Sequence, residues 1–228
     1  IYTTGNGAQT INNTGSITVG DSSTETDPSI GIYNESNNNI INNSGDISSG
    51  KTSIGIYNKG GKVYQSSGTI DVGEAGVGIY SDSGTLNLSS GLLNLNGLNT
   101  VGIYAIDNVV IDNNMLMNVS DESFGVVLNS GSSLINRNVS TVGDHGVFAY
   151  SDGGAFITNE LGADITMTGS KSVGVYMTNG GTITNKASII ANAGDSNIGI
   201  YNNGGSIDNS GDIKIGDSVI VDPLNPFA

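Results

Sequence analysis

The chain has 228 residues, with 35 glycines and 3 prolines, and its 21 acidic and 7 basic residues give a formal net charge of −14. The basic residues are scattered singly, which argues against a nucleic acid or an anionic bilayer surface as a partner, because both require clustered lysine and arginine. Abundant glycine and asparagine disfavour helix, while regularly spaced isoleucine and valine favour strands and argue against disorder.

The chain contains no cysteine, which excludes disulfides and thiolate metal sites. This composition suits a protein that is exported unfolded through a narrow pore, although a chain can also lack cysteine for no such reason. No signal peptide and no run of 18 apolar residues is visible. Residues 1–2 already look like the end of a repeat and residues 224–228 do not resemble a cap. We therefore expect residues 1–228 to be a single segment of a longer protein.

The clearest internal repeat is a tetrad of an apolar residue, a glycine, a second apolar residue and an aromatic residue. The tetrad begins as Ile30-Gly31-Ile32-Tyr33 and recurs every 21 to 28 residues, with degenerate copies in the middle of the chain. Alternation of apolar and other residues indicates a β-strand in each copy. In chain order, the predicted strands are 30–33, 54–57, 77–80, 101–104, 124–127, 145–148, 173–176 and 198–201.

Two further elements separate successive tetrads. The first reads I-N-N-S-G-D-I at residues 41–47, and related copies read I-N-N-T-G-S-I at 11–17 and I-D-N-S-G-D-I at 207–213. Directly after it, apolar and polar residues alternate again, as at Ile70 and Val72. A short turn that begins with glycine then leads back to the next tetrad, and glycine, asparagine and serine supply the other turns.

Each repeat thus holds three short strands and three turns. Because every repeat runs in the same direction, each strand can pair with its own copy one coil later, at a spacing of about 4.8 Å. The predicted fold is all-β, a right-handed parallel β-helix of about nine coils of roughly 24 residues, with three short strands per coil. Antiparallel hairpins are the main rival fold, but they usually join unlike neighbours.

Strand alternation assigns side chains to faces. We expect the first and third tetrad residues, such as Ile30 and Ile32, to point into the core, and the glycine and the aromatic residue to point outward. Tetrad aromatics would then stack into an exposed column, with Val127 filling one gap, that either stabilises the sheet or contacts a partner. This candidate partner-binding surface comprises Tyr33, Tyr57, Tyr80, Tyr104, Phe148, Tyr176 and Tyr201.

Asparagine follows the aromatic residue in several repeats. Asn34, Asn58 and Asn202 are expected at a turn, where their amides can stack along the fibre axis. Two insertions, 21–28 and the stretch from 217 through 223, both begin within a Gly-Asp-Ser sequence and contain Asp-Pro. Such loops can bind a partner or can be neutral surface loops, and the sequence leaves both open.

Few residues suggest a catalytic or metal-binding role. The only arginine, Arg137, has no acidic residue within six positions, and the only histidine, His145, is predicted at the first tetrad position as either a hydrogen-bonded structural group or a pH-sensitive one. Asp144, Asp152 and Asp164 are numerous enough for a glycosidase carboxylate pair, but they do not cluster in the sequence. Calcium-binding loop motifs are absent. We predict no catalytic residue, cofactor or metal site.

The tetrads and the I-N-N-S-G-D-I elements resemble the passenger regions of type V autotransporter adhesins, most closely those of large fusobacterial surface proteins. This resemblance covers residues 2 to about 221. It implies a non-catalytic rod at the cell surface, anchored to the outer membrane through a C-terminal barrel that this chain does not contain, that binds a protein or glycan receptor on host cells or other bacteria. The segment itself would not contact the membrane. A carbohydrate-active β-helix enzyme, such as a polysaccharide lyase, hydrolase or tailspike, is the alternative.

Overall fold

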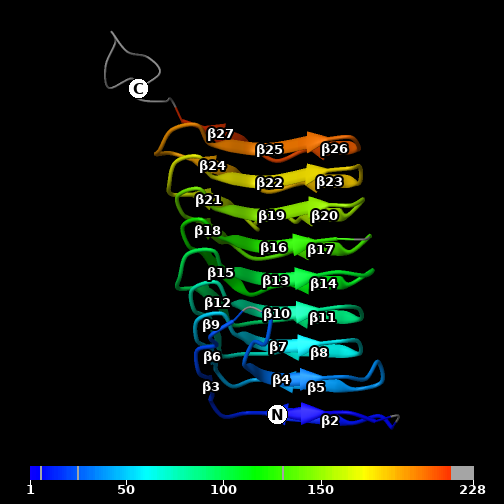
Figure 1. Cartoon of the computed structure of the whole chain (residues 1–228). Coiled ribbons are helices and arrows are strands. Elements are labelled where there is room, and N and C mark those ends of the chain that lie inside the picture. Colours follow the sequence, from blue (N-terminus) through cyan, green and yellow to red (C-terminus); the bar gives the residue numbers. More distant parts are fainter. Residues whose placement is uncertain (6, 25, 130, 217–228) are drawn as a thin grey trace.

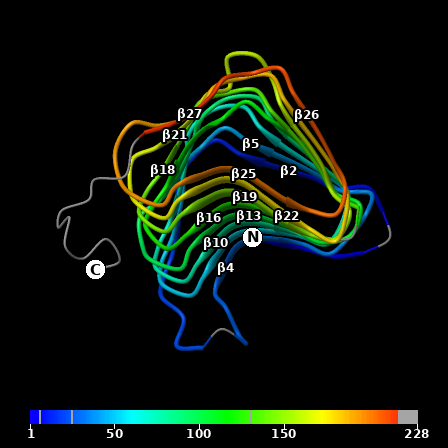
Figure 2. The same ribbon diagram turned by 90° about the horizontal axis from the view of Figure 1, so that it is seen from above.

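The computed structural model describes residues 1–5, 7–24, 26–129 and 131–216. They form a parallel β-solenoid of three sheets, each with nine strands, and contain no helix (Figure 1). No helix able to span a membrane is therefore present among these residues. Seen from above, the coils superpose into a three-sided outline and turn anticlockwise as they rise toward the viewer, so the solenoid is right-handed (Figure 2). The predicted fold is confirmed.

The chain visits the three sheets, here called A, B and C, in the same order in every coil. Sheet A holds β1 (Tyr2–Thr3), β4 (Ile30–Asn34), β7 (Ile54–Asn58), β10 (Val77–Ser81), β13 (Val101–Ala105), β16 (Phe124–Leu128), β19 (Val147–Asp152), β22 (Val173–Thr178) and β25 (Ile198–Asn203). Sheet B holds β2 (Thr10–Asn13), β5 (Ile40–Asn43), β8 (Lys62–Gln65), β11 (Thr85–Leu88), β14 (Val110–Asn113), β17 (Ser133–Asn136), β20 (Phe156–Asn159), β23 (Thr182–Asn185) and β26 (Ser206–Asn209). Sheet C holds β3 (Ile17–Val19), β6 (Ile47–Ser49), β9 (Thr69–Val72), β12 (Leu92–Leu95), β15 (Leu116–Val119), β18 (Ser140–Val142), β21 (Ile165–Met167), β24 (Ile189–Ala191) and β27 (Ile213–Ile215).

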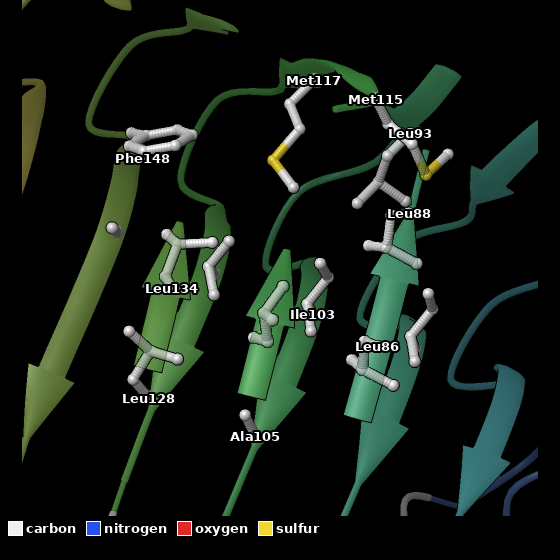
Figure 3. Packing of buried hydrophobic residues seen from close by; sticks show 14 of the residues in the cluster. Leu86, Leu88, Leu93, Ile103, Ala105, Met115, Met117, Leu128, Leu134 and Phe148 are labelled. Atoms are coloured by element: carbon white, nitrogen blue, oxygen red, sulfur yellow. The ribbon is translucent and has the colours of Figure 1, made fainter. Parts of the chain in front are cut away.

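Strand pairing places equivalent residues of successive repeats above one another. Tyr33 pairs with Tyr57, and Ile56 pairs with Ile79. The third tetrad residue is fully buried in coil after coil, as at Ile32, Ile56 and Ile79. Inward side chains from the three sheets fill the interior as one continuous apolar column (Figure 3). A single coil could not close such a core, so each coil depends on its neighbours.

The predicted faces of the tetrad are wrong at its first two positions. A Cβ on Gly102 would lie 2.9 Å from the inward side chain of Leu93 and 2.5 Å from the carbonyl oxygen of Gly125. The glycine therefore faces the core, and it can approach the next coil because it lacks a side chain. Because glycine and the next residue both face inward, the first tetrad residue is displaced to the outer face. Ile30 and Val173 are accordingly only partly buried.

The tetrad predicted at 145–148 is shifted by two residues. Pairing aligns Val147 with Phe124 and Tyr150 with Val127, so Tyr150 occupies the aromatic position. Phe148 takes the inward glycine position and is fully buried. Its placement in the outward column is therefore wrong.

Smaller residues in the same coil accommodate the buried Phe148 ring. Ala149 replaces the isoleucine or valine found at its position in the other coils, and Ser140 stands where the preceding coils have Met117 or an aliphatic residue. Close-packed interiors tolerate such exchanges when the total volume is conserved.

Asparagines form hydrogen-bonded ladders inside the corners. Asn34 donates to Asn58 at 2.8 Å, and both are fully buried at the ends of their strands. Asn202 does not extend this ladder, because Met177 precedes it in register. A longer ladder closes sheet B, where each amide donates to its counterpart in the next coil. It runs through Asn13, Asn43 and Gln65, is interrupted by Leu88, and continues from Asn113 through Asn136, Asn159, Asn185 and Asn209.

The insertion at 21–28 leaves the coil at the corner between sheets C and A, and Figure 2 shows its described part projecting from the outline. The Ser22 hydroxyl accepts a hydrogen bond from the Ser29 amide at 2.5 Å and closes the base of this loop. The second predicted insertion, 217–223, lies outside the described residues.

The corner between sheets C and A places a non-glycine residue in the left-handed backbone region in most coils. The positions are Thr52, Ala75, Asn99, Glu122, His145, Lys171 and Ser196, with φ between 52° and 59°. This conformation costs roughly 1–2 kcal/mol for residues with a side chain, and more than average for a β-branched residue such as threonine.

We expect Thr52→Gly to raise the free energy of unfolding by about 0.5–1 kcal/mol, because glycine adopts this backbone without strain. Chemical denaturation of the full chain measures the change. Thr69→Gly is the matched control, since Thr69 begins strand β9. The control should destabilise by about 1 kcal/mol. Equal effects of the two substitutions would contradict the assigned turn conformation.

Candidate binding surface

The outer face of sheet A carries an aromatic column. Tyr33, Tyr57, Tyr80 and Tyr104 stack with ring centroids 4.7 to 5.4 Å apart and interplanar angles of 3° to 12°. Tyr2 extends this stack at its start with a tilted ring. A second stack joins Tyr150, Tyr176 and Tyr201. Of the predicted column, every tyrosine is in place, Val127 fills the gap as expected, and Tyr150 takes the place assigned to Phe148.

Tyrosine hydroxyl groups bond polar side chains that lie two positions after the paired column residue of the next coil. Tyr57 donates to Asp82 Oδ2 at 2.8 Å, and Asn129 Nδ2 donates to the Tyr104 hydroxyl at 3.2 Å. Burial, followed by the hydrogen bond to Asp82, raises the pKa of Tyr57 well above its usual value. Burial and the nearby Asp152 carboxylate raise the pKa of Tyr150 in the same direction. The Tyr57 hydroxyl therefore stays protonated at neutral pH and donates to Asp82.

Tyr57 should resist ionisation at alkaline pH. A raised folded pKa means that the folded state keeps a proton which the unfolded state loses above about pH 10, so stability should fall as pH rises beyond that value. The chain has no tryptophan, so ultraviolet absorbance reports tyrosine ionisation directly. Asp82→Asn should bring the ionisation of Tyr57 to lower pH, whereas Asp71→Asn, on sheet C, should not. Identical titration curves for the wild type and Asp82→Asn would contradict the bond.

Stacking determines how the column can meet a ligand. Within each stack, both faces of an internal tyrosine are covered by its neighbours, so only ring edges and hydroxyls point outward. A ligand that stacks on an aromatic face therefore needs the end of a stack. This arrangement gives most of the column a sheet-stabilising role through cross-strand ring contacts.

Stacking is interrupted once, at Val127, between Tyr104 and Tyr150. A hollow with a volume of about 340 Å³ opens here, lined by both tyrosines, Val127, Asn129 and Asp152 together with Val101 and Phe124. Phe124 occupies the first tetrad position and stands nearly perpendicular to Tyr150, at 74° and 5.8 Å. The sequence analysis did not place Tyr150 in the column. The V-F-A-Y sequence at 147–150 has the same spacing as V-G-I-Y at 77–80 and could have indicated this position.

The three aspartates considered for catalysis lie at three different corners of the solenoid. Asp144 Oδ1 accepts the Ser170 amide between sheets C and A, which lowers the pKa of the carboxyl group. Asp164 Oδ1 accepts the Ser188 amide between sheets B and C, and Asp152 lies at the end of β19. The structure does not bring them together as a carboxylate pair.

Arg137 and His145 each contact an aspartate, and His145 does not occupy its predicted tetrad position. Arg137 Nε pairs with Asp112 Oδ1 at 2.6 Å from the previous coil, a contact that sequence distance concealed. His145 lies in the turn rather than at a tetrad position, is 45% exposed, and bonds Asp144 Oδ2 at 2.8 Å. Among the described residues, no group of three histidine or acidic side chains has the arrangement of a metal site.

Comparison with protein-family models, with curated proteins and with solved structures finds no match to this chain.

Proposed function

We propose that this chain is a non-catalytic segment of a binding rod at a bacterial surface, with an adhesive role. The observation that supports this proposal is the coil-on-coil register of sheet A, which repeats one outer face along the described coils, with a tyrosine column that is interrupted at Val127. A solenoid of this kind lengthens by adding coils, because each coil contacts only its neighbours. Such a rod can hold a binding surface away from its anchor.

The resemblance of the repeats to autotransporter passenger regions supports the location and the partner class. By that likeness, the rod would be anchored to the outer membrane by a barrel and would attach to a protein or glycan receptor on host cells or other bacteria. The net charge of −14 opposes a nucleic acid or an anionic membrane as the receptor.

Attachment of protein-coated beads tests this proposal. Beads that carry the full chain should bind to epithelial cells or to other bacteria more than beads that carry an acidic globular protein of equal charge, and soluble chain should compete. Failure of the coated beads to bind any cell type would contradict the adhesive role.

An enzymatic role is tested on the same material. Incubation of the chain with bacterial and host polysaccharides should leave their length distribution unchanged. Release of reducing ends or of unsaturated sugars would overturn the non-catalytic assignment in favour of a β-helix hydrolase or lyase.

A further inference from the structure

The interruption of the tyrosine column is a built feature of one coil. Val127 occupies the tyrosine position, and it is paired in register with Tyr104 on one side and Tyr150 on the other. Each of these tyrosines stacks on its other neighbour, Tyr80 or Tyr176, so the remaining face of each ring is turned toward the missing position. The rings of Tyr104 and Tyr150 therefore flank a one-residue gap, and Phe124, from the same strand as Val127, packs against the Tyr150 ring at an interplanar angle of 74° beside it.

The width of this gap selects the shape of its occupant. Two coil steps separate the flanking rings by about 9.6 Å. A flat ring in contact with both faces needs only about 7 Å, which is twice the carbon–carbon contact distance, so a flat ring would contact one side only. A puckered ring in a chair conformation, with hydrogens on both faces, needs on the order of 9 Å and can touch both tyrosines at once.

The rim of the gap carries hydrogen-bonding groups. Thr178 and Asn179 from the next coil both donate to Asp152 Oδ1, at 3.0 and 2.5 Å, and fix the orientation of this carboxylate. Asn129 Nδ2 donates a hydrogen bond to the Tyr104 hydroxyl, and the side-chain amide of Asn129 also lines the rim of the gap. The floor is the apolar side chain of Val127, of which neighbouring side chains leave only 7% exposed, and Phe124 lines one side.

We propose that the slot between Tyr104 and Tyr150 binds a single neutral pyranose ring of a glycan. The sugar's C–H faces would pack on the two tyrosine rings, and its hydroxyls would donate to Asp152 and exchange hydrogen bonds with Asn129. The Asp152 carboxylate and the chain's negative charge disfavour sialylated or sulfated sugars. This inference rests on the proposed adhesive function and names the class of receptor and the place where it binds.

The test fills the slot without disturbing the fold. Val127→Tyr completes the tyrosine ladder, so the variant should melt at or above the wild-type temperature, yet it should lose at least tenfold in affinity for neutral oligosaccharides. Thr158→Tyr is the matched control, because it adds a tyrosine to the outer face of sheet B, where Tyr64 occupies the corresponding position in another coil. The control should bind as the wild type does. Asp152→Ala should weaken binding about tenfold, the expected loss for a hydrogen bond to a charged group.

Titration of the full chain with gluco-, galacto-, manno- and N-acetylglucosamine oligosaccharides, followed by NMR of valine methyl groups, measures binding at the slot itself. Shifts of the Val127 methyls in the wild type that need about tenfold more sugar in Asp152→Ala support the proposal. It is overturned if no neutral sugar shifts these methyls, if Val127→Tyr binds as well as wild type, or if only sialylated sugars or aromatic peptides bind. Bead attachment that persists in Val127→Tyr would refute the slot and leave the adhesive role standing.

Discussion

Ile79→Asp is expected to destabilise the solenoid by more than about 4 kcal/mol, because it places an unpaired charge in a fully apolar site. Ile79 is fully buried, and the residues paired with it, Ile56 and Ile103, are fully buried as well. An aspartate there can neither reach solvent nor find a cation. The loss should be largest in the coils of β7, β10 and β13, because each coil contacts only its neighbours.

Chemical denaturation and hydrogen exchange of the full chain measure this effect. Ile79→Val, which keeps the site apolar, should cost only about 1 kcal/mol. Tyr80→Ser, one residue away on the outer face, should cost about 2 kcal/mol through lost stacking on Tyr57 and Tyr104. Unchanged expression and stability of Ile79→Asp would mean that this side chain does not point inward.

Asn136→Asp is expected to destabilise the fold by about 3–5 kcal/mol at neutral pH, because it replaces a donor inside a buried ladder by a second acceptor. Asn136 is fully buried, and its Nδ2 donates to the carbonyl oxygen of Asn138 and to Asn159 Oδ1, both at 3.0 Å. An aspartate oxygen in that place would face two acceptors. Re-orientation of Asn159 would in turn break its bond to Asn185.

The defect of Asn136→Asp should depend on pH. Burial beside acceptors raises the folded pKa of the new carboxyl group above its unfolded value of about 3.9. Below the unfolded value, both states are protonated and the penalty for charge is absent. The penalty grows as pH rises through that value and is complete above the folded pKa. The difference in stability from wild type at each pH measures it, and a difference independent of pH would contradict the burial of this group.

Asn136→Leu separates charge from loss of hydrogen bonds. Leucine occurs naturally at the equivalent position, where Leu88 lies between Gln65 and Asn113 in register. The substitution should cost about 1–3 kcal/mol, for the partners that it leaves unsatisfied, and the cost should not vary with pH. An Asn136→Leu variant as unstable as Asn136→Asp would contradict the charge argument.

Period and direction of the repeat were sufficient to predict the solenoid. Copies such as Ile30-Gly31-Ile32-Tyr33 recur at nearly constant spacing and in one direction. In stacked parallel strands, every copy can pair with the equivalent copies of the adjacent coils. The third tetrad residue as core and the tyrosines as an outer column also followed, because both depend on simple strand alternation. The asparagine that follows the tetrad was expected at a turn, but the buried ladders of sheet B were not foreseen.

The tertiary structure decided the details that depend on contacts between coils. Gly31 and Ile32 are successive residues within β4 that both face the core, which breaks the alternation on which the assignment of Ile30 rested. Phe148 is buried because the neighbouring strands set the register of β19 and smaller residues make room for the ring, whereas the H-G-V-F pattern alone suggested a tetrad two residues earlier.

The candidate slot shows the same division. That the column lacks a tyrosine at Val127 can be read from the amino-acid sequence. The two rings that flank the gap, the Phe124 wall and the Asp152 rim come from three coils, and the pairing of Arg137 with Asp112 likewise joins separate coils. Repeat spacing determines which residues share a column, but side-chain orientation within a column depends on the packing of adjacent coils, and that packing exists only in the folded stack.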